Sequence, residues 1–122
     1  MEEPHRLKRV VWIKSSRKDL KSFPGDVKRT VGLALYQAQL GGKAPSAKPL
    51  SGFTGAGVVE IVADYNTDTY RVVYTVTFGD FVYVLHAFQK KSKRGSATPK
   101  PDVALIRSRL KDAQVDYKYR VG

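Results

Sequence analysis

The chain has 122 residues, and its 22 Lys and Arg residues exceed its 11 Asp and Glu residues, which gives a formal net charge of 22 − 11 = +11. A hydrophobic content of 42% can bury one sizeable core, so the composition predicts a single domain over residues 1–122 and excludes disorder of the whole chain. The absence of cysteine excludes a disulfide framework, a thiolate zinc site and a cysteine nucleophile, and it favours a reducing, cytoplasmic setting.

The first half of the chain predicts one strand, two helices and a long loop. Residues 10–14 are β-branched and aromatic, as is typical of a strand, and a short helix with Leu20 and Phe23 is predicted from Ser16. After Pro24 a second helix is predicted, which ends at the glycines 41 and 42. Its apolar residues recur at helical spacing: Val27, Val31, Ala34, Leu35 and Ala38. Residues 43–57 contain two prolines and no apolar periodicity, so they are predicted to be a loop.

Three β-rich runs, 58–65, 70–78 and 81–90, predict an antiparallel meander. Glycine and aspartate at 79–80 suit a two-residue hairpin turn, which would place Tyr74 opposite Leu85 and Arg71 opposite Phe88. A four-residue turn at 66–69 would place Arg71 opposite Asp64. In these registers one face of the sheet is apolar throughout, so we expect the helices to pack on that face.

The last part of the chain predicts a connector at 96–101 and one helix from Asp102. Its apolar side is formed by Val103, Ile106, Leu110 and Ala113. The tail, 114–122, is expected to be flexible or an edge strand. The whole chain is therefore predicted to be an α+β domain, in which two N-terminal helices and one C-terminal helix cover one face of the meander.

The excess of Lys and Arg favours a polyanionic partner such as nucleic acid. No apolar run approaches the roughly 18 residues of a membrane span, and the N-terminus lacks the apolar stretch of a signal peptide, so we expect a soluble protein without membrane contact. No residue pattern in the chain points to a metal or a cofactor.

Several segments resemble the RelE/ParE superfamily of toxins, and within it the phage-derived, HigB-like branch. They are KDLKSFP at 18–24, AKPLSGF at 47–53, VVEI at 58–61, DTYRVVYT at 68–75 and YVLHAFQKKSKRG at 83–95. The resemblance covers about residues 8–113, and it implies a small RelE-like domain that pairs with a helix-turn-helix antitoxin. Many members cut messenger RNA on the ribosome, and some relatives instead poison DNA gyrase.

Metal-free RNA cleavage needs a base, an acid and positive charge against the developing phosphorane. Arg71 is our first candidate, because a guanidinium can bind a phosphate with two hydrogen bonds and the family places a functional arginine on the equivalent strand. The alternative is a structural ion pair with Asp64 or Glu60. Glu60 is a candidate general base, or it is only the counter-ion of Arg71.

The remaining site candidates lie on the last strand of the meander and just after it. His86 is a candidate acid or base, or a structural residue, and Phe88 either stacks on a base or fills the sheet surface. A β-bulge in the LHAF segment would exchange the two. Lys91 is a candidate for proton transfer. RNA-binding candidates are Lys90, Lys93 and Arg94, although such a basic run can also be a solvated strand end.

We expect from these residues and the resemblance a ribosome-associated, metal-independent mRNA endoribonuclease that a cognate antitoxin neutralises. One alternative is a non-enzymatic inhibitor of gyrase or another complex. Another is a basic RNA-binding module without cleavage. A strand arginine with a glutamate and a histidine nearby favours chemistry, whereas a purely basic face would favour binding alone.

Overall fold

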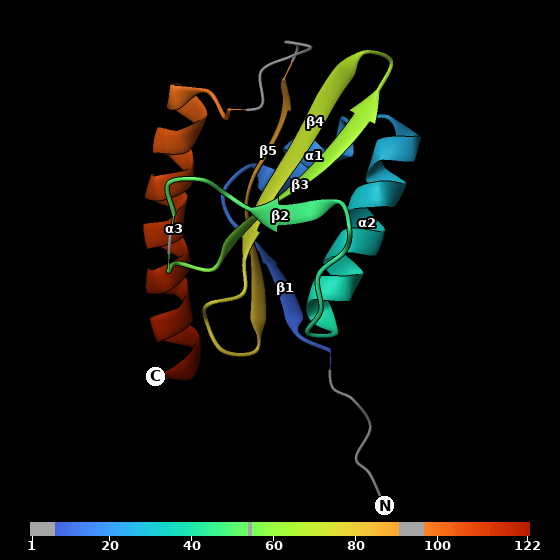
Figure 1. Ribbon diagram of the computed structural model, residues 1–122. Coiled ribbons are helices and arrows are strands. Elements are labelled where there is room, and N and C mark those ends of the chain that lie inside the picture. The colour runs from blue at the N-terminus through green and yellow to red at the C-terminus, as the bar shows by residue number, and fades with distance from the viewer. Residues whose placement is uncertain (1–6, 54, 91–96) are drawn as a thin grey trace, which may run out of the picture.

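A five-stranded sheet forms the centre of the computed structural model, which describes residues 7–53, 55–90 and 97–122. The strands lie in the order β1-β5-β4-β3-β2, and helices cover both faces (Figure 1). The elements are β1 (Arg9–Trp12), α1 (Ser16–Lys21), α2 (Gly25–Gln39), β2 (Ala47–Pro49), β3 (Val58–Tyr65), β4 (Asp68–Thr75), β5 (Phe81–Lys90) and α3 (Lys100–Val121). The architecture confirms the predicted α+β class and the predicted meander of β3, β4 and β5.

The turn between β3 and β4 is shorter than predicted. Tyr65 pairs with Asp68, which leaves two turn residues, Asn66 and Thr67, with φ values of 50° and 68°. Left-handed residues at both positions give a turn whose twist matches that of the strands. The register is therefore shifted, and Arg71 lies opposite Val62 instead of Asp64.

A β-bulge interrupts the pairing of β4 with β5. Val73 pairs with His86 and Tyr74 pairs with Val84, so Leu85 is the extra residue. The predicted pair of Tyr74 with Leu85 is therefore wrong. Beyond the bulge the predicted pair of Arg71 with Phe88 is confirmed.

The two edges of the sheet differ from the expected meander. β1 pairs in parallel with β5, with Val10 opposite Val82, which makes the sheet mixed. β2 lies within the segment predicted to be a loop, and it pairs with β3 through only three residues. A strand of this length that contains Pro49 has no periodicity to detect, and it forms because β3 offers it an unpaired edge.

The expectation that all helices pack on one face is wrong. α1 and α2 pack on one side, where Val31 contacts the cluster that contains Val72 and Tyr74. α3 packs on the other side, where Ile106 belongs to a cluster with Val73 and Leu85. Figure 1 shows α3 and α2 on opposite sides of the sheet. The continuous apolar run at 72–74 reflects this, since a strand buried on both faces loses its alternation.

The C-terminal tail is helical, so neither form predicted for it is correct. α3 runs without interruption to Val121, because no Gly or Pro occurs between its first turn and Gly122. Asp116 and Arg120 form an ion pair four positions apart that supports the last turns. No helix among the described residues combines the length and the apolar character needed to cross a membrane.

Candidate functional site

A buried ion pair lies on the sheet face that α3 covers. Arg71 on β4 donates from Nη1 to both carboxylate oxygens of Glu60 on β3, at 3.1 Å each. The side chains are 5% and 2% exposed, respectively. The hydroxyl of Thr98 donates to Glu60 Oε2 at 3.0 Å. This carboxylate is thus satisfied from two sides, as a buried charge requires.

Lys90 lies next to this pair, near the end of β5. It pairs with Thr69, two positions along β4 from Arg71, and its Nζ donates to the carbonyl of Ala97. Lys90 is 8% exposed, so it is not part of a solvated strand end. Lys91, Lys93 and Arg94, which complete the predicted basic run, lie outside the described residues.

A cleft of about 490 Å³ connects Glu60 with solvent. Its walls come from the β2 region and from the segment that leads into α3: Lys48, Pro49, Leu50, Ser51, Ala97, Thr98 and Val103. Glu60 forms its floor, because it is 2% exposed and still lines the space. The volume is typical of pockets that hold one small ligand, and Lys48 supplies an exposed cation at the rim.

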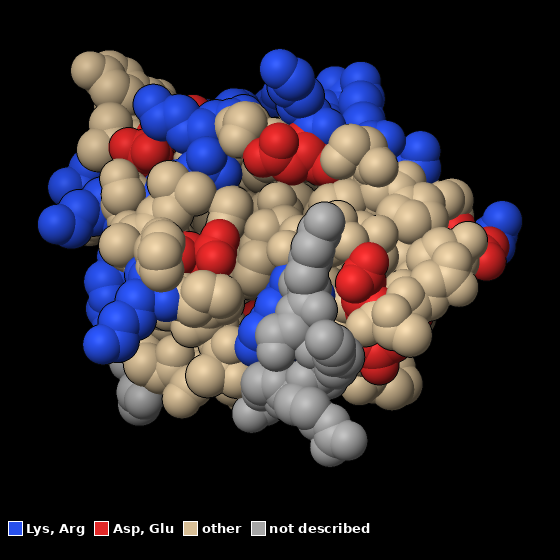
Figure 2. Space-filling model, turned by 90° about the horizontal axis from the view of Figure 1, so that it is seen from above, with Lys and Arg blue, Asp and Glu red and all other residues tan. Residues whose placement is uncertain are grey.

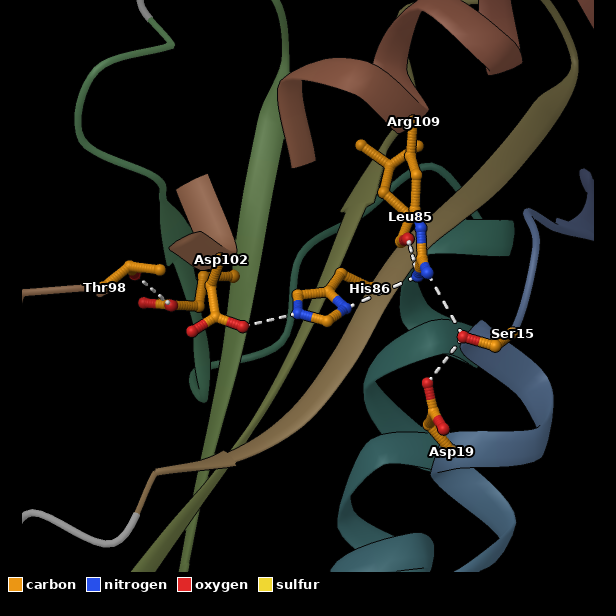
Figure 3. A network of polar contacts seen from close by, with 8 residues as sticks. Ser15, Asp19, Leu85, His86, Thr98, Asp102 and Arg109 are labelled. Atoms are coloured by element: carbon orange, nitrogen blue, oxygen red, sulfur yellow. Dashed lines mark hydrogen bonds and ion pairs between the residues drawn. The ribbon is translucent and has the colours of Figure 1, made fainter. Parts of the chain in front are cut away.

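Both ring nitrogens of His86 face α3 (Figure 3). Nε2 lies 2.7 Å from Asp102 Oδ1, and Nδ1 lies 3.4 Å from Nη1 of Arg109. Since a guanidinium can only donate, this geometry assigns the proton to Nε2 and the acceptor role to Nδ1. The ring stacks on Phe88 with 4.8 Å between centroids. His86 therefore docks α3 onto the sheet, and neither nitrogen is free for substrate in this arrangement.

Arg109 is the central residue of this network and was not among the predicted site residues. Besides His86 it donates to the carbonyl of Leu85 at 3.0 Å and to Ser15 Oγ at 3.2 Å, and Ser15 donates to Asp19 at 2.8 Å. The network joins α3, β5 and α1 (Figure 3). One feature of the sequence could have indicated it, because an arginine at 109 interrupts the apolar side of the predicted helix.

A second polar cluster anchors the C-terminal half of α3. Tyr83 donates to Asp116 Oδ2 at 2.8 Å, and Arg120 pairs with the same carboxylate. Burial and the neighbouring Asp116 raise the pKa of Tyr83 to about 12. Burial raises the pKa of Asp116, but hydrogen bonds from Arg120 and Tyr83 outweigh it, so this pKa lies below its usual value. This cluster lies far along β5 from Glu60 and Arg71 and serves to hold α3.

The predicted site residues that the structure describes lie close together, but they are buried. Glu60, Arg71, His86 and Lys90 are each less than a tenth exposed, and Phe88 packs with them in the cluster beneath α3. The expected packing of all helices on the apolar face would have left these residues uncovered, and it is wrong because α3 packs on their side of the sheet. Within the described residues, no group of three His, Asp or Glu side chains is arranged to hold a metal ion.

Comparison with known proteins identifies one family. The family described as "Phage derived protein Gp49-like (DUF891)" matches residues 18–111. No curated protein matches the chain. Among solved structures, the chain is similar to one in the crystal structure of the toxin–antitoxin complex RelBE2 from Mycobacterium tuberculosis, with 20% identity and a TM-score of 0.47. That similarity covers 75% of this chain and 100% of the other.

Proposed function

This chain belongs to the Gp49-like family of phage-derived proteins, and we propose that it is the toxin of a type II toxin–antitoxin pair and an mRNA endoribonuclease. We place it in the HigB-like branch, in the cytoplasm and on the ribosome, with a helix-turn-helix antitoxin as its partner. The observation that carries the proposal is the carboxylate of Glu60 at the floor of the cleft, held by Arg71 and Thr98. The resemblance of residues 8–113 to RelE/ParE toxins supports it.

The chemistry we propose transfers the phosphoryl group within the RNA strand. Glu60 takes the proton of a 2′-hydroxyl, whose oxygen then attacks the adjacent phosphorus, and the bond from phosphorus to the 5′-oxygen breaks. Arg71, beside Glu60, offers a guanidinium to the negative charge that develops on the phosphorane. Lys91, the candidate for proton transfer, protonates the leaving 5′-oxygen.

The depth of the pair sets how RNA must enter. Glu60 meets solvent through the cleft, and Lys48 at the rim is placed to contact a phosphate of the incoming strand. Thr98, just before α3, and Val103 in its first turns form one wall of the cleft.

A second candidate function has its own support. His86 and Lys90 are less than a tenth exposed and hydrogen-bonded within the chain. A set of polar residues that is internally satisfied is also what a purely structural network requires, and this favours an inhibitor of gyrase or of another complex that acts by binding alone. A basic RNA-binding module without cleavage fits the same observation.

Controlled expression of the chain in a bacterial host, followed by mapping of new 5′ ends in messages, separates these functions. We expect new ends inside translated regions, and a loss of about 100-fold or more in their yield for Glu60→Gln, as for removal of a general base. Thr98→Val removes only one hydrogen bond to Glu60 and is expected to give an intermediate loss. Lys111→Gln, on the exposed side of α3, is the matched control.

Circular dichroism and thermal melting of each purified variant show whether it is folded. Growth arrest by the wild-type chain without new 5′ ends would refute the nuclease. Altered DNA supercoiling in those cells would then support the gyrase inhibitor, and RNA binding with neither effect would support the RNA-binding module.

A further inference from the structure

α1 and its flanks carry a row of exposed cations on the α2 side of the sheet. Arg17, Lys18 and Lys21 are exposed, and spacings of three and four positions place them on one side of the helix. The opposite side is anchored, since Ser16 Oγ donates to the carbonyl of Val84 and Leu20 packs on the core. The helix is therefore fixed in orientation, with its basic side toward solvent.

Two further lysines extend this row. Lys14 precedes α1 and is exposed, and Lys28 on α2 donates from Nζ to the carbonyl of Lys21 at 3.4 Å. We call the five residues the α1 basic surface: Lys14, Arg17, Lys18, Lys21 and Lys28. Figure 2 shows Lys and Arg side chains gathered along the edge of the molecule where α1 lies.

The α1 basic surface keeps a net positive charge, although the carboxylates of Asp19 and Asp26 are close in sequence. Asp19 accepts a hydrogen bond from Ser15, and Asp26 pairs with Arg29. In the part of the chain that the structure describes, no carboxylate lies within ion-pair distance of any of the five cations. Their charges are therefore available to an external anion.

The chemistry of this surface favours nucleic acid over protein. Protein interfaces have a core enriched in aromatic and apolar residues, whereas phosphate contacts need only cations and polar groups. The exposed large hydrophobic residues of the described chain are Leu7, Leu33, Tyr36, Val115, Tyr119 and Val121, and none lies between positions 14 and 28. A surface with five cations and no apolar anchor fits a phosphate backbone.

The position of the surface separates it from the cleft. Leu20 and Phe23 pack in the cluster on the α2 side, whereas Glu60 and Arg71 lie beneath the segment that leads into α3. We propose that the α1 basic surface binds the phosphate backbone of a structured RNA, which is distinct from the strand that enters the cleft. This inference rests on the proposed function and deepens it, because the chain then binds RNA at two separate places, on opposite sides of the sheet.

The test compares two variants with the same net charge. Arg17→Gln, Lys18→Gln and Lys21→Gln together remove three charges from the α1 basic surface. The control combines Lys43→Gln, Lys111→Gln and Lys118→Gln, which are exposed elsewhere. Binding to a labelled RNA hairpin is measured as a function of salt concentration. We expect the α1 variant to lower the slope of log Kd against log salt by about 3, and the control to change it by less than about 1.

An equal decrease of the salt slope in the two variants would overturn the inference, because it would indicate a diffuse electrostatic field and not a binding site. An unchanged slope in the α1 variant would also overturn it, as would tighter binding of an acidic protein than of the hairpin. The proposed function fails separately. Absence of new 5′ ends refutes the nuclease even if the α1 variant loses RNA binding, and normal cleavage with unchanged binding refutes the α1 site alone.

Discussion

Arg71 Nη1 lies 3.1 Å from both carboxylate oxygens of Glu60, and both side chains are almost completely buried between the sheet and the segment that leads into α3. Burial of two charges carries a desolvation cost that their attraction offsets only while both are present. The pair is therefore sensitive to loss of one member and tolerant of loss of both. This distinguishes its contribution to stability from its proposed chemistry.

We predict that Glu60→Gln lowers the free energy of unfolding by about 3 kcal/mol, because it removes the carboxylate charge that the buried Arg71 guanidinium contacts. The double variant Glu60→Leu with Arg71→Met is expected to recover most of this loss. Urea denaturation of the wild type, Glu60→Leu, Arg71→Met and the double variant measures the coupling free energy between the two residues. Additive losses in the double variant would show that the two residues do not act as a pair.

Arg109 is expected to stabilise the fold through its hydrogen bonds, although it lies on the apolar side of α3. Arg109→Met keeps much of the side-chain volume but removes the hydrogen bonds to Leu85, His86 and Ser15, and we predict a loss of about 2–3 kcal/mol. Ser15→Ala removes one of these bonds and is expected to cost about 1 kcal/mol. Thermal melting compares the two, and an equal loss would contradict the central role of Arg109.

Tyr83 gives the protein a specific alkaline instability. Its pKa of about 12 exceeds the usual value of 10, so its contribution to stability is complete below pH 10 and is lost as the pH rises toward 12. We predict that the unfolding free energy falls less steeply between pH 10 and 12 in Tyr83→Phe than in the wild type. Urea titrations at a series of pH values give the two slopes, and parallel slopes would refute the prediction.

Two glycine substitutions are expected to have opposite effects. Gly79 has a φ of +58°, and a Cβ there would lie 2.7 Å from the hydroxyl of Tyr117, so Gly79→Ala should destabilise the fold by about 1 kcal/mol or more. Gly32 lies within α2 with open space around it, so Gly32→Ala should stabilise it by up to about 1 kcal/mol. Differential scanning calorimetry measures the expected decrease of the melting temperature for Gly79→Ala and the expected increase for Gly32→Ala. A gain in stability for Gly79→Ala would mean that the turn at 78–81 relaxes.

Local periodicity was sufficient to predict the strands of the meander, the two N-terminal helices and the start of α3 within a few residues. The predicted pair of Arg71 with Phe88 is correct because the extra residue at Leu85 restores, beyond the bulge, the register that the predicted turn at 79–80 would give. The sequence indicated a β-bulge in the LHAF segment only as an alternative, and it did not predict the two-residue turn at 66–67, since both features depend on pairing between strands. The role of Arg109 was also missed, because its partner Ser15 is 94 residues away in the chain.

The sequence by itself determined which polar residues share a sheet face, because side chains alternate along a strand. It also determined the basic character of the chain, because net charge depends only on composition. Their exposure does not follow from it. Glu60 meets Thr98 across 38 residues of chain, and α3 docks on the polar face through His86 and Arg109. Contacts between residues so distant in sequence depend on which face of the sheet each helix packs against. The packing of α3 therefore decides that Glu60 and Arg71 are buried and that Glu60 meets solvent through a cleft.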